Sequence, residues 1–137
     1  MRDVLRAEEV LAKLQNRPAA LPLLTYSGTK HCLAFFNPDT YQIGLNNLLF
    51  TAPDPSDLLR AYLHEARHAY QFHAIHHPDA HPEMQPVTIE EWRQAERDYV
   101  HLTPDATPAE VAENVNNLLE IDARKYVERR MRAFDER

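Results

Sequence analysis

His64 and His68 are four residues apart, and Glu65 directly follows the first of them. On an α-helix, two residues at this spacing lie on one face about one turn apart, so both imidazoles can reach a single metal ion. Imidazole nitrogens suit zinc, which in catalytic sites keeps one coordination position free for water. A carboxylate at the position of Glu65 can take a proton from that water, because zinc lowers the pKa of the water towards neutrality. The spacing predicts a zinc site; the alternative is two solvated histidines on a helix face.

A catalytic zinc site needs a third protein ligand. A histidine six residues after His68 could serve, but position 74 is alanine. Glu120 and Asp122 lie in the most apolar part of the last predicted helix, where a carboxylate is unfavourable unless it is paired or bound to a metal. We therefore expect Glu120 to be a ligand and Asp122 to accept a hydrogen bond from an imidazole N–H. The alternative is a buried salt bridge from these carboxylates to an arginine.

The elements that position these residues are predicted from apolar spacing and helix-capping residues. Helices are expected over residues 3–16, from 56 or 57 to about 77, from 88 to about 101, and from 107 to about 134. Ser56 or Asp57 is the expected cap of the second helix. Capping boxes are expected for the third helix, at Thr88 with Glu91, and for the fourth, at Thr107 with Glu110.

Short strands are predicted over residues 23–26, 31–36 and 41–45. The turn sequence at 37–40 is expected to join the second and third strands in a hairpin. Residues 78–87 contain three prolines and are expected to form a surface loop. We therefore expect a single α+β domain over residues 1–137, mostly helical, with a small N-terminal sheet beside the helix that carries His64.

The segment 64–69, together with Glu120-Ile121-Asp122-Ala123 beginning fifty-two residues after His68, resembles the zincin metallopeptidases of the glutamate-ligand (gluzincin) type. It is similar in particular to small metallopeptidases of bacteria and phages whose final helix carries Glu-x-Asp-Ala. Residues 36–46 resemble the hairpin that precedes the active-site helix in minimal zincins, so the resemblance covers about residues 31–128. It implies a minimal zincin-like fold with one zinc ion per chain, bound by His64, His68 and Glu120, and Glu65 as the catalytic base.

The resemblance also implies a zinc-dependent endopeptidase that binds an extended peptide along an outer strand, near Tyr41–Asn46. The chain is short, so we expect a narrow protein substrate, or a partner protein that completes the cleft. Larger gluzincins have a separate histidine or tyrosine that stabilises the tetrahedral intermediate, and Tyr126 and Tyr99 are the candidates here; each is otherwise a core aromatic residue. The alternative function is a catalytically silent, zinc-stabilised binding or regulatory module, which would have no need for Glu65.

A second group of histidines follows the zinc-binding pattern, at positions 73, 76, 77 and 81. Such a cluster can bind a transition metal adventitiously, or serve a metal sensor or carrier. We interpret these residues as solvated histidines around a helix end, where a charged imidazole interacts favourably with the helix dipole.

The composition excludes several other classes of protein. Fifteen basic and twenty-one acidic residues give a net charge of −6, which disfavours binding to nucleic acid. The single Cys32 excludes an internal disulfide and fits a reducing, cytoplasmic location. We expect no membrane association, because no apolar run approaches the roughly 18 residues of a membrane span and the N-terminus does not resemble a signal peptide.

Overall fold

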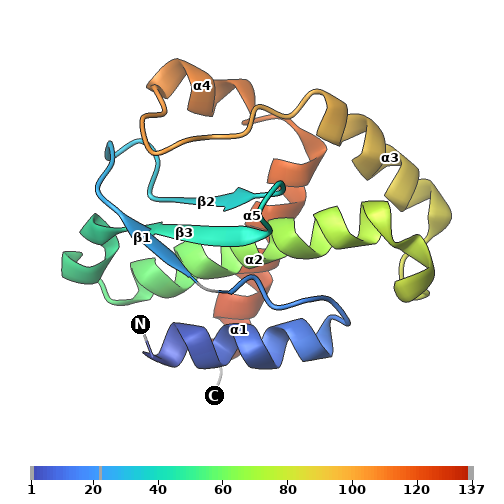
Figure 1. The fold of residues 1–137 in the computed structure, drawn as a ribbon, viewed down its shortest axis with the longest axis horizontal. Coiled ribbons are helices and arrows are strands. Elements are labelled where there is room, and N and C mark those ends of the chain that lie inside the picture. The colour runs from blue at the N-terminus through green and yellow to red at the C-terminus, as the bar shows by residue number, and fades with distance from the viewer. Residues whose placement is uncertain (1, 22, 136–137) are drawn as a thin grey trace.

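The computed structural model describes residues 2–21 and 23–135, which form a mostly helical α+β fold (Figure 1). The predicted fold class is confirmed. The helices are α1 (Arg2–Leu14), α2 (Ser56–His76), α3 (Pro86–Arg97), α4 (Pro108–Glu113) and α5 (Leu118–Asp135). The strands are β1 (Leu24–Tyr26), β2 (Ala34–Asn37) and β3 (Gln42–Asn46). Short 3-10 helices cover Asn47–Thr51 and Pro78–Ala80.

The small sheet packs against α2, and α5 crosses α2 steeply (Figure 1). Ile43 and Leu45 of β3 are fully buried and belong to one apolar cluster with Leu63 of α2 and Val127 of α5. A second apolar cluster joins α2, α3 and α5 and includes Tyr70, Trp92 and Leu119. The long helix α2 is thus fixed on both sides, by the sheet and by α5, over the stretch that contains the predicted zinc ligands.

The strand order is β1-β3-β2, so β3 is the central strand. The predicted hairpin is confirmed, because β2 and β3 pair antiparallel. The expectation that Tyr41–Asn46 forms an outer strand is wrong, because β1 pairs in parallel with β3 along its other side, with Leu24 opposite Gly44. The sequence predicts the strand over residues 23–26, but the residues of a strand do not specify which other strand it pairs with, so only the fold reveals this pairing. The two edge strands of the sheet are therefore β1 and β2.

Two predicted helix starts need correction. Helix α2 begins without a side-chain cap from its N-cap, Pro55; instead, the carboxylate of Asp54 accepts hydrogen bonds from the backbone N–H and the hydroxyl of Ser56. Helix α3 begins at Pro86 rather than Thr88 and ends at Arg97, and no capping box forms there. Proline is well suited to the first helical turn, because its missing N–H has no intrahelical partner there.

The last predicted helix is interrupted, although its capping box at Thr107 and Glu110 is confirmed. Helix α4 ends at Glu113 and α5 begins at Leu118. The side chain of Asn114 bonds both the N–H and the C=O of Val100, at 2.9 and 2.6 Å. The side chain of Asn117 accepts from the N–H of Leu119 and donates to the C=O of Ala95. These side chains compete with the helical hydrogen bonds, and the break redirects the chain.

A consequence of the break is that the apolar residues Val115 and Leu118 are 47% and 46% exposed. A second consequence is that Glu120 lies in the first turn of α5, where a negative charge interacts favourably with the helix dipole.

Helix α1 contributes a buried ion pair that its sequence pattern did not predict. Glu8 is fully buried and accepts hydrogen bonds from Arg17 at 2.7 and 2.9 Å and from the hydroxyl of Tyr62 at 2.8 Å. The backbone N–H of Ala20 also donates to Glu8. Because every polar atom is paired, this network can stabilise the contact between α1 and α2 despite its burial.

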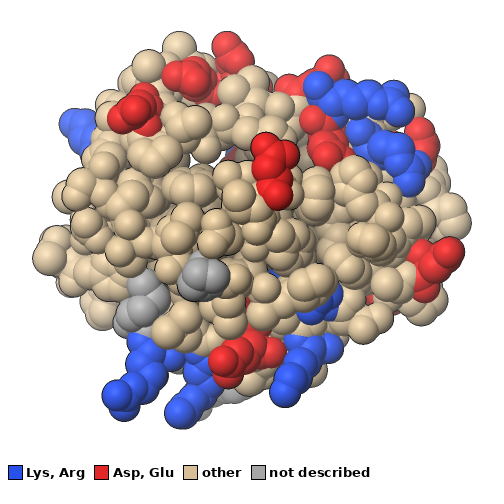
Figure 2. All heavy atoms as spheres, in the orientation of Figure 1, with Lys and Arg blue, Asp and Glu red and all other residues tan. Residues whose placement is uncertain are grey.

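The charged residues lie mostly around the rim of the face seen in Figure 1. On the face of Figure 1, uncharged residues form most of the middle, whereas Lys and Arg gather along the lower edge near α1 and at the end that carries α3 (Figure 2). Within residues 2–21 and 23–135, no helix combines the length and the apolar character needed to cross a bilayer.

Candidate metal centre

The side chains of His64, His68 and Glu120 meet where α2 and α5 cross. The Nε2 atom of His64 lies 2.6 Å from one carboxylate oxygen of Glu120, and the Nε2 atom of His68 lies 3.2 Å from the other. The two imidazole rings are 4.9 Å apart and nearly perpendicular. One carboxylate from α5 therefore reaches both histidines of α2, as the spacing and the apolar setting of Glu120 predicted.

Glu65 lies beside this group, on the side towards the sheet. Its carboxylate and the imidazole donors of His64 and His68 are all within 4.8 Å of one another, a grouping that could hold a metal ion. The side chain is largely buried, with the residue 8% exposed. Glu65 and Glu120 thus both lie close to the two histidines.

Burial and the neighbouring charges shift the pKa values of Glu65, His68 and Glu120. Burial alone would lower the pKa of His68, but the hydrogen bond to Glu120 and the charges of Glu65 and Glu120 raise it to about 9. Burial alone would raise the pKa of Glu120, but hydrogen bonds from His64 and His68 hold that pKa well below its usual range. Burial raises the pKa of Glu65, and the two imidazoles reduce this rise only in part. Glu65 therefore has a higher proton affinity than an ordinary glutamate.

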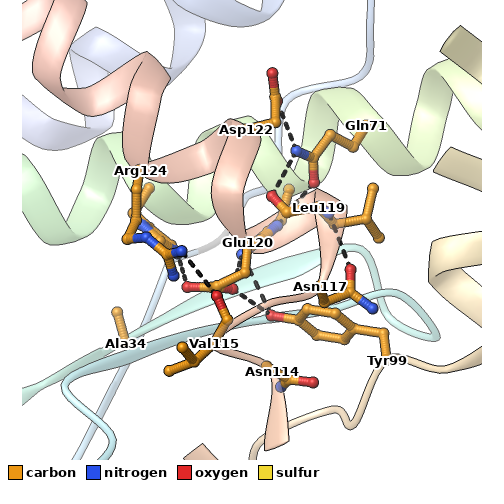
Figure 3. A network of polar contacts seen from close by, with 12 residues as sticks. Ala34, Gln71, Tyr99, Asn114, Val115, Asn117, Leu119, Glu120, Asp122 and Arg124 are labelled. Atoms are coloured by element: carbon orange, nitrogen blue, oxygen red, sulfur yellow. Dashed lines mark hydrogen bonds and ion pairs between the residues drawn. The ribbon is translucent and has the colours of Figure 1, made fainter. Parts of the chain in front are cut away.

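Asp122 does not contact a histidine, so its predicted role as direct acceptor of an imidazole N–H is wrong. Its carboxylate accepts from Arg67 at 2.7 and 3.2 Å and from the side-chain amide of Gln71 at 2.7 Å. The oxygen of that amide lies 2.9 Å from Nδ1 of His68. The salt bridge that was the alternative interpretation holds for Asp122 but not for Glu120. Figure 3 shows Gln71 between Asp122 and the start of α5.

Gln71 was missed in the sequence, although a signal was present. It follows His68 by three residues, so the two side chains lie on the same face of α2. Gln71 is only 1% exposed, and buried amides are normally hydrogen-bonded to a specific partner.

Of the two candidate tyrosines, Tyr99 lies at the candidate centre and Tyr126 does not. The hydroxyl of Tyr99 donates to Glu120 at 3.0 Å and lies 3.4 Å from Nε2 of His68 (Figure 3). Burial and the charges of Glu120 and Glu65 raise the pKa of Tyr99, so its hydroxyl stays protonated. Tyr126 lies elsewhere, with its ring against Arg67 and its hydroxyl 3.5 Å from Gln15. Six residues after Glu120, it projects from a different face of α5.

Cavities flank the four central residues on both sides. A small cavity of about 40 Å³ adjoins Glu65 and His68; its apolar lining comes from β2, α2, α5 and the segment after α3, and includes Phe36, Phe72, Ile75, Leu102 and Leu119. A wider groove on the other side is lined by residues that include Lys30, His31, Ala34, Arg60, His64 and Arg124. Ala34 of β2 borders both.

The second histidine group differs in part from the predicted solvated residues. His76 and His77 are exposed, but His81 is only 1% exposed, and its Nε2 atom lies 2.6 Å from Nδ1 of His73. The ring of His81 also packs edge-on against Tyr70. Burial, together with the nearby His81, His77 and Arg17, lowers the pKa of His73 to about 4.

This lowered pKa predicts an acid-sensitive contribution to stability. The unfolded chain binds the proton of His73 with a pKa near 6.5, so stability is lost as the pH falls from about 6.5 to 4 and is constant above. Because His73 is partly exposed and solvent screens its charge, we expect the free energy of unfolding to fall by about 1–2 kcal/mol. Urea unfolding at pH 7 and pH 4.5 should show a smaller loss for His73→Gln than for wild type. His31→Gln, at an exposed position, should behave as wild type; equal losses in all three proteins would refute the assignment.

Comparison of the chain with family models, with curated protein sequences and with solved structures gives no match. The function must therefore be argued from the residues of this chain alone.

Proposed function

We propose that the protein is a zinc-dependent metallopeptidase in which His64, His68 and Glu120 hold one zinc ion. The observation that carries this proposal is the position of the Glu120 carboxylate, within 2.6 and 3.2 Å of the two Nε2 atoms, although it comes from a different helix. Two imidazoles and one carboxylate are a donor set that zinc uses in catalytic sites. The Nδ1 atom of His68 is already engaged by Gln71, which leaves Nε2 for the metal.

A bound zinc ion would polarise the scissile carbonyl and lower the pKa of a water molecule. Glu65 is the residue that would take the proton from this water and pass it to the leaving amine. Its position supports the role, because its carboxylate lies within 4.8 Å of both histidine donors and its pKa is raised. A base with a pKa closer to neutrality transfers protons more effectively in both directions.

The open edge of β2 is the proposed site for an extended peptide. The N–H of Asn46 donates to the C=O of Leu33, and Ala34 is opposite Leu45, so the hydrogen-bonding groups of Ala34 and Phe36 face away from β3. Ala34 borders the cavities on both sides of Glu65. A peptide paired to this edge would therefore cross the metal centre, with one side chain directed to the apolar cavity.

Tyr99 is proposed to donate a hydrogen bond to the oxygen that becomes negative during the reaction. Its hydroxyl lies beside Glu120 and His68 and stays protonated. We expect Tyr99→Phe to lower kcat about 10²-fold with little change in KM or zinc content. Tyr126→Phe, outside the centre, is the matched control and should retain activity. A loss of zinc from Tyr99→Phe, or equal effects of the two substitutions, would contradict this role.

The second candidate is a zinc-stabilised binding or regulatory module without hydrolytic activity. It is favoured by the closeness of Glu65 to both histidines, because Glu65 as a fourth ligand would close the site. The two functions differ in what Glu65→Gln does to zinc affinity. If Glu65 is the catalytic base, Glu65→Gln leaves the zinc affinity nearly unchanged. If Glu65 is a ligand, the same substitution weakens zinc binding.

The proposed function is tested by zinc content and peptide cleavage. The purified chain should bind about one zinc ion, and mass spectrometry of a peptide library should show cleavage that stops with a chelator and returns with zinc. We expect cleavage of few sequences, or of a target presented by a partner protein. The proposal would be overturned if the purified chain bound no zinc and if His64→Ala lowered neither zinc content nor cleavage.

A further inference from the structure

We infer that Gln71 is a positioning residue that sets the orientation and the tautomer of His68, and through them the affinity of the site for zinc. The inference rests on the proposed zinc site and extends it to a buried residue that is not itself a zinc ligand. The evidence for it is the set of hydrogen bonds made by the buried side-chain amide of Gln71.

The amide of Gln71 has only one favourable orientation. Its nitrogen donates to the backbone C=O of Leu119 at 2.9 Å and to the carboxylate of Asp122 at 2.7 Å. Both partners are acceptors, so rotation of the amide by 180° would place its oxygen against two other oxygens. The amide oxygen is therefore held towards His68, 2.9 Å from Nδ1.

This orientation determines which nitrogen of His68 is available to a metal. An amide oxygen can only accept, so Nδ1 of His68 must carry a hydrogen. The lone pair of the neutral ring then belongs to Nε2, the atom that faces Glu120 at 3.2 Å. The ring is also prevented from rotating about its Cβ–Cγ bond, because rotation would break the bond to Gln71.

The acceptor that orients Gln71 is itself firmly held. Arg67 donates to Asp122 through two nitrogens, and its guanidinium lies 4.9 Å from the ring of Tyr70, 5.6 Å from Trp92 and 4.9 Å from Tyr126. Three aromatic faces around one guanidinium leave it little freedom. A chain of contacts thus runs from this aromatic group through Arg67, Asp122 and Gln71 to His68.

Gln71 also couples the two helices that supply the ligands. The carbonyl of Leu119, which accepts from Gln71, immediately precedes Glu120 in the first turn of α5. The same amide therefore holds a ligand of α2 by its oxygen and the backbone beside a ligand of α5 by its nitrogen. Loss of this amide should loosen both ligands together.

The test measures zinc affinity by competition with a chromophoric chelator, for the full chain. Gln71→Leu should bind zinc about 10–100-fold more weakly than wild type. The visible spectrum of the cobalt-substituted protein should change in band position or intensity, because His68 is no longer held in place. Tyr62→Phe, which removes a buried hydrogen bond from α2 to Glu8 of α1 and none to the candidate ligands, should leave both readouts unchanged.

A paired substitution separates positioning from loss of packing. Gln71→Glu should weaken zinc binding, because a carboxylate would face Asp122 and the carbonyl of Leu119. Adding Asp122→Asn to Gln71→Glu restores a donor opposite the new carboxylate, and we expect it to recover a substantial part of the affinity. This rescue would not follow from a merely structural role.

The outcomes distinguish this inference from the proposed function. Tight zinc binding and an unchanged cobalt spectrum in folded Gln71→Leu would overturn the role of Gln71 and leave the zinc site intact. If Gln71→Leu fails to fold, absence of rescue by the Gln71→Glu, Asp122→Asn pair would overturn it instead. Failure of the wild-type chain to bind zinc would refute the proposed function.

Discussion

Replacing Glu65 by glutamine is expected to lower peptide cleavage by about 10²–10⁴-fold while the chain still binds one zinc ion. Glutamine has nearly the same shape and can still hydrogen-bond water, but it cannot accept a proton. The raised pKa of Glu65 and its closeness to both histidine donors make it the proton acceptor that the proposed reaction requires. The measurement is kcat/KM on a cleaved peptide, alongside zinc content.

The matched control for this substitution is Glu91→Gln, the same chemical change at an exposed position of α3. It should retain wild-type activity. Full activity in Glu65→Gln would rule out Glu65 as the general base. A strong loss of zinc in the same variant would favour the closed, non-catalytic site, because Glu65 would then be a ligand.

Replacing Glu120 by alanine is expected to weaken zinc binding by about 10²–10³-fold and to abolish cleavage. The estimate follows from the binding free energy of protein zinc sites shared among their ligands. Glu120 is the only carboxylate among the described residues that contacts the Nε2 atoms of both histidines. Its removal leaves two imidazoles from a single helix, which is too few for a stable zinc site.

The control is Glu128→Gln on the same helix, whose side chain is 65% exposed. Isothermal titration with zinc at fixed pH should give wild-type affinity for this variant and a large loss for Glu120→Ala. Comparable zinc affinity in Glu120→Ala and wild type would remove Glu120 from the ligand set. The proposed centre would then have to recruit Glu65, which lies within 4.8 Å of both histidine donors.

The sequence by itself determined the features that depend on short spacing. His64 and His68 lie on one face of a helix because four residues make about one turn, whatever the rest of the fold does. The capping box at Thr107 forms because both of its partners lie within one turn. The apolar surroundings of Glu120 also marked it as a carboxylate that needs a partner, and it lies against both histidines.

Only the tertiary structure decided what depends on how distant elements pack. The parallel pairing of β1 made β3 a central strand and left β2 as the free edge, a result of contacts about twenty residues apart. The break before α5 arose from side chains that bond Val100 and Ala95 on the preceding segment. Neither contact has a periodic signature in the sequence.

The same holds for the surroundings of the candidate metal centre. Asp122 was predicted to contact an imidazole, but the crossing of α2 and α5 placed Gln71 between them. The crossing also separated Tyr99, beside Glu120, from Tyr126. The spacing of residues on one helix fixes which face a side chain occupies. Which residue of another helix meets that face is fixed by packing of the core, which a single helix does not encode.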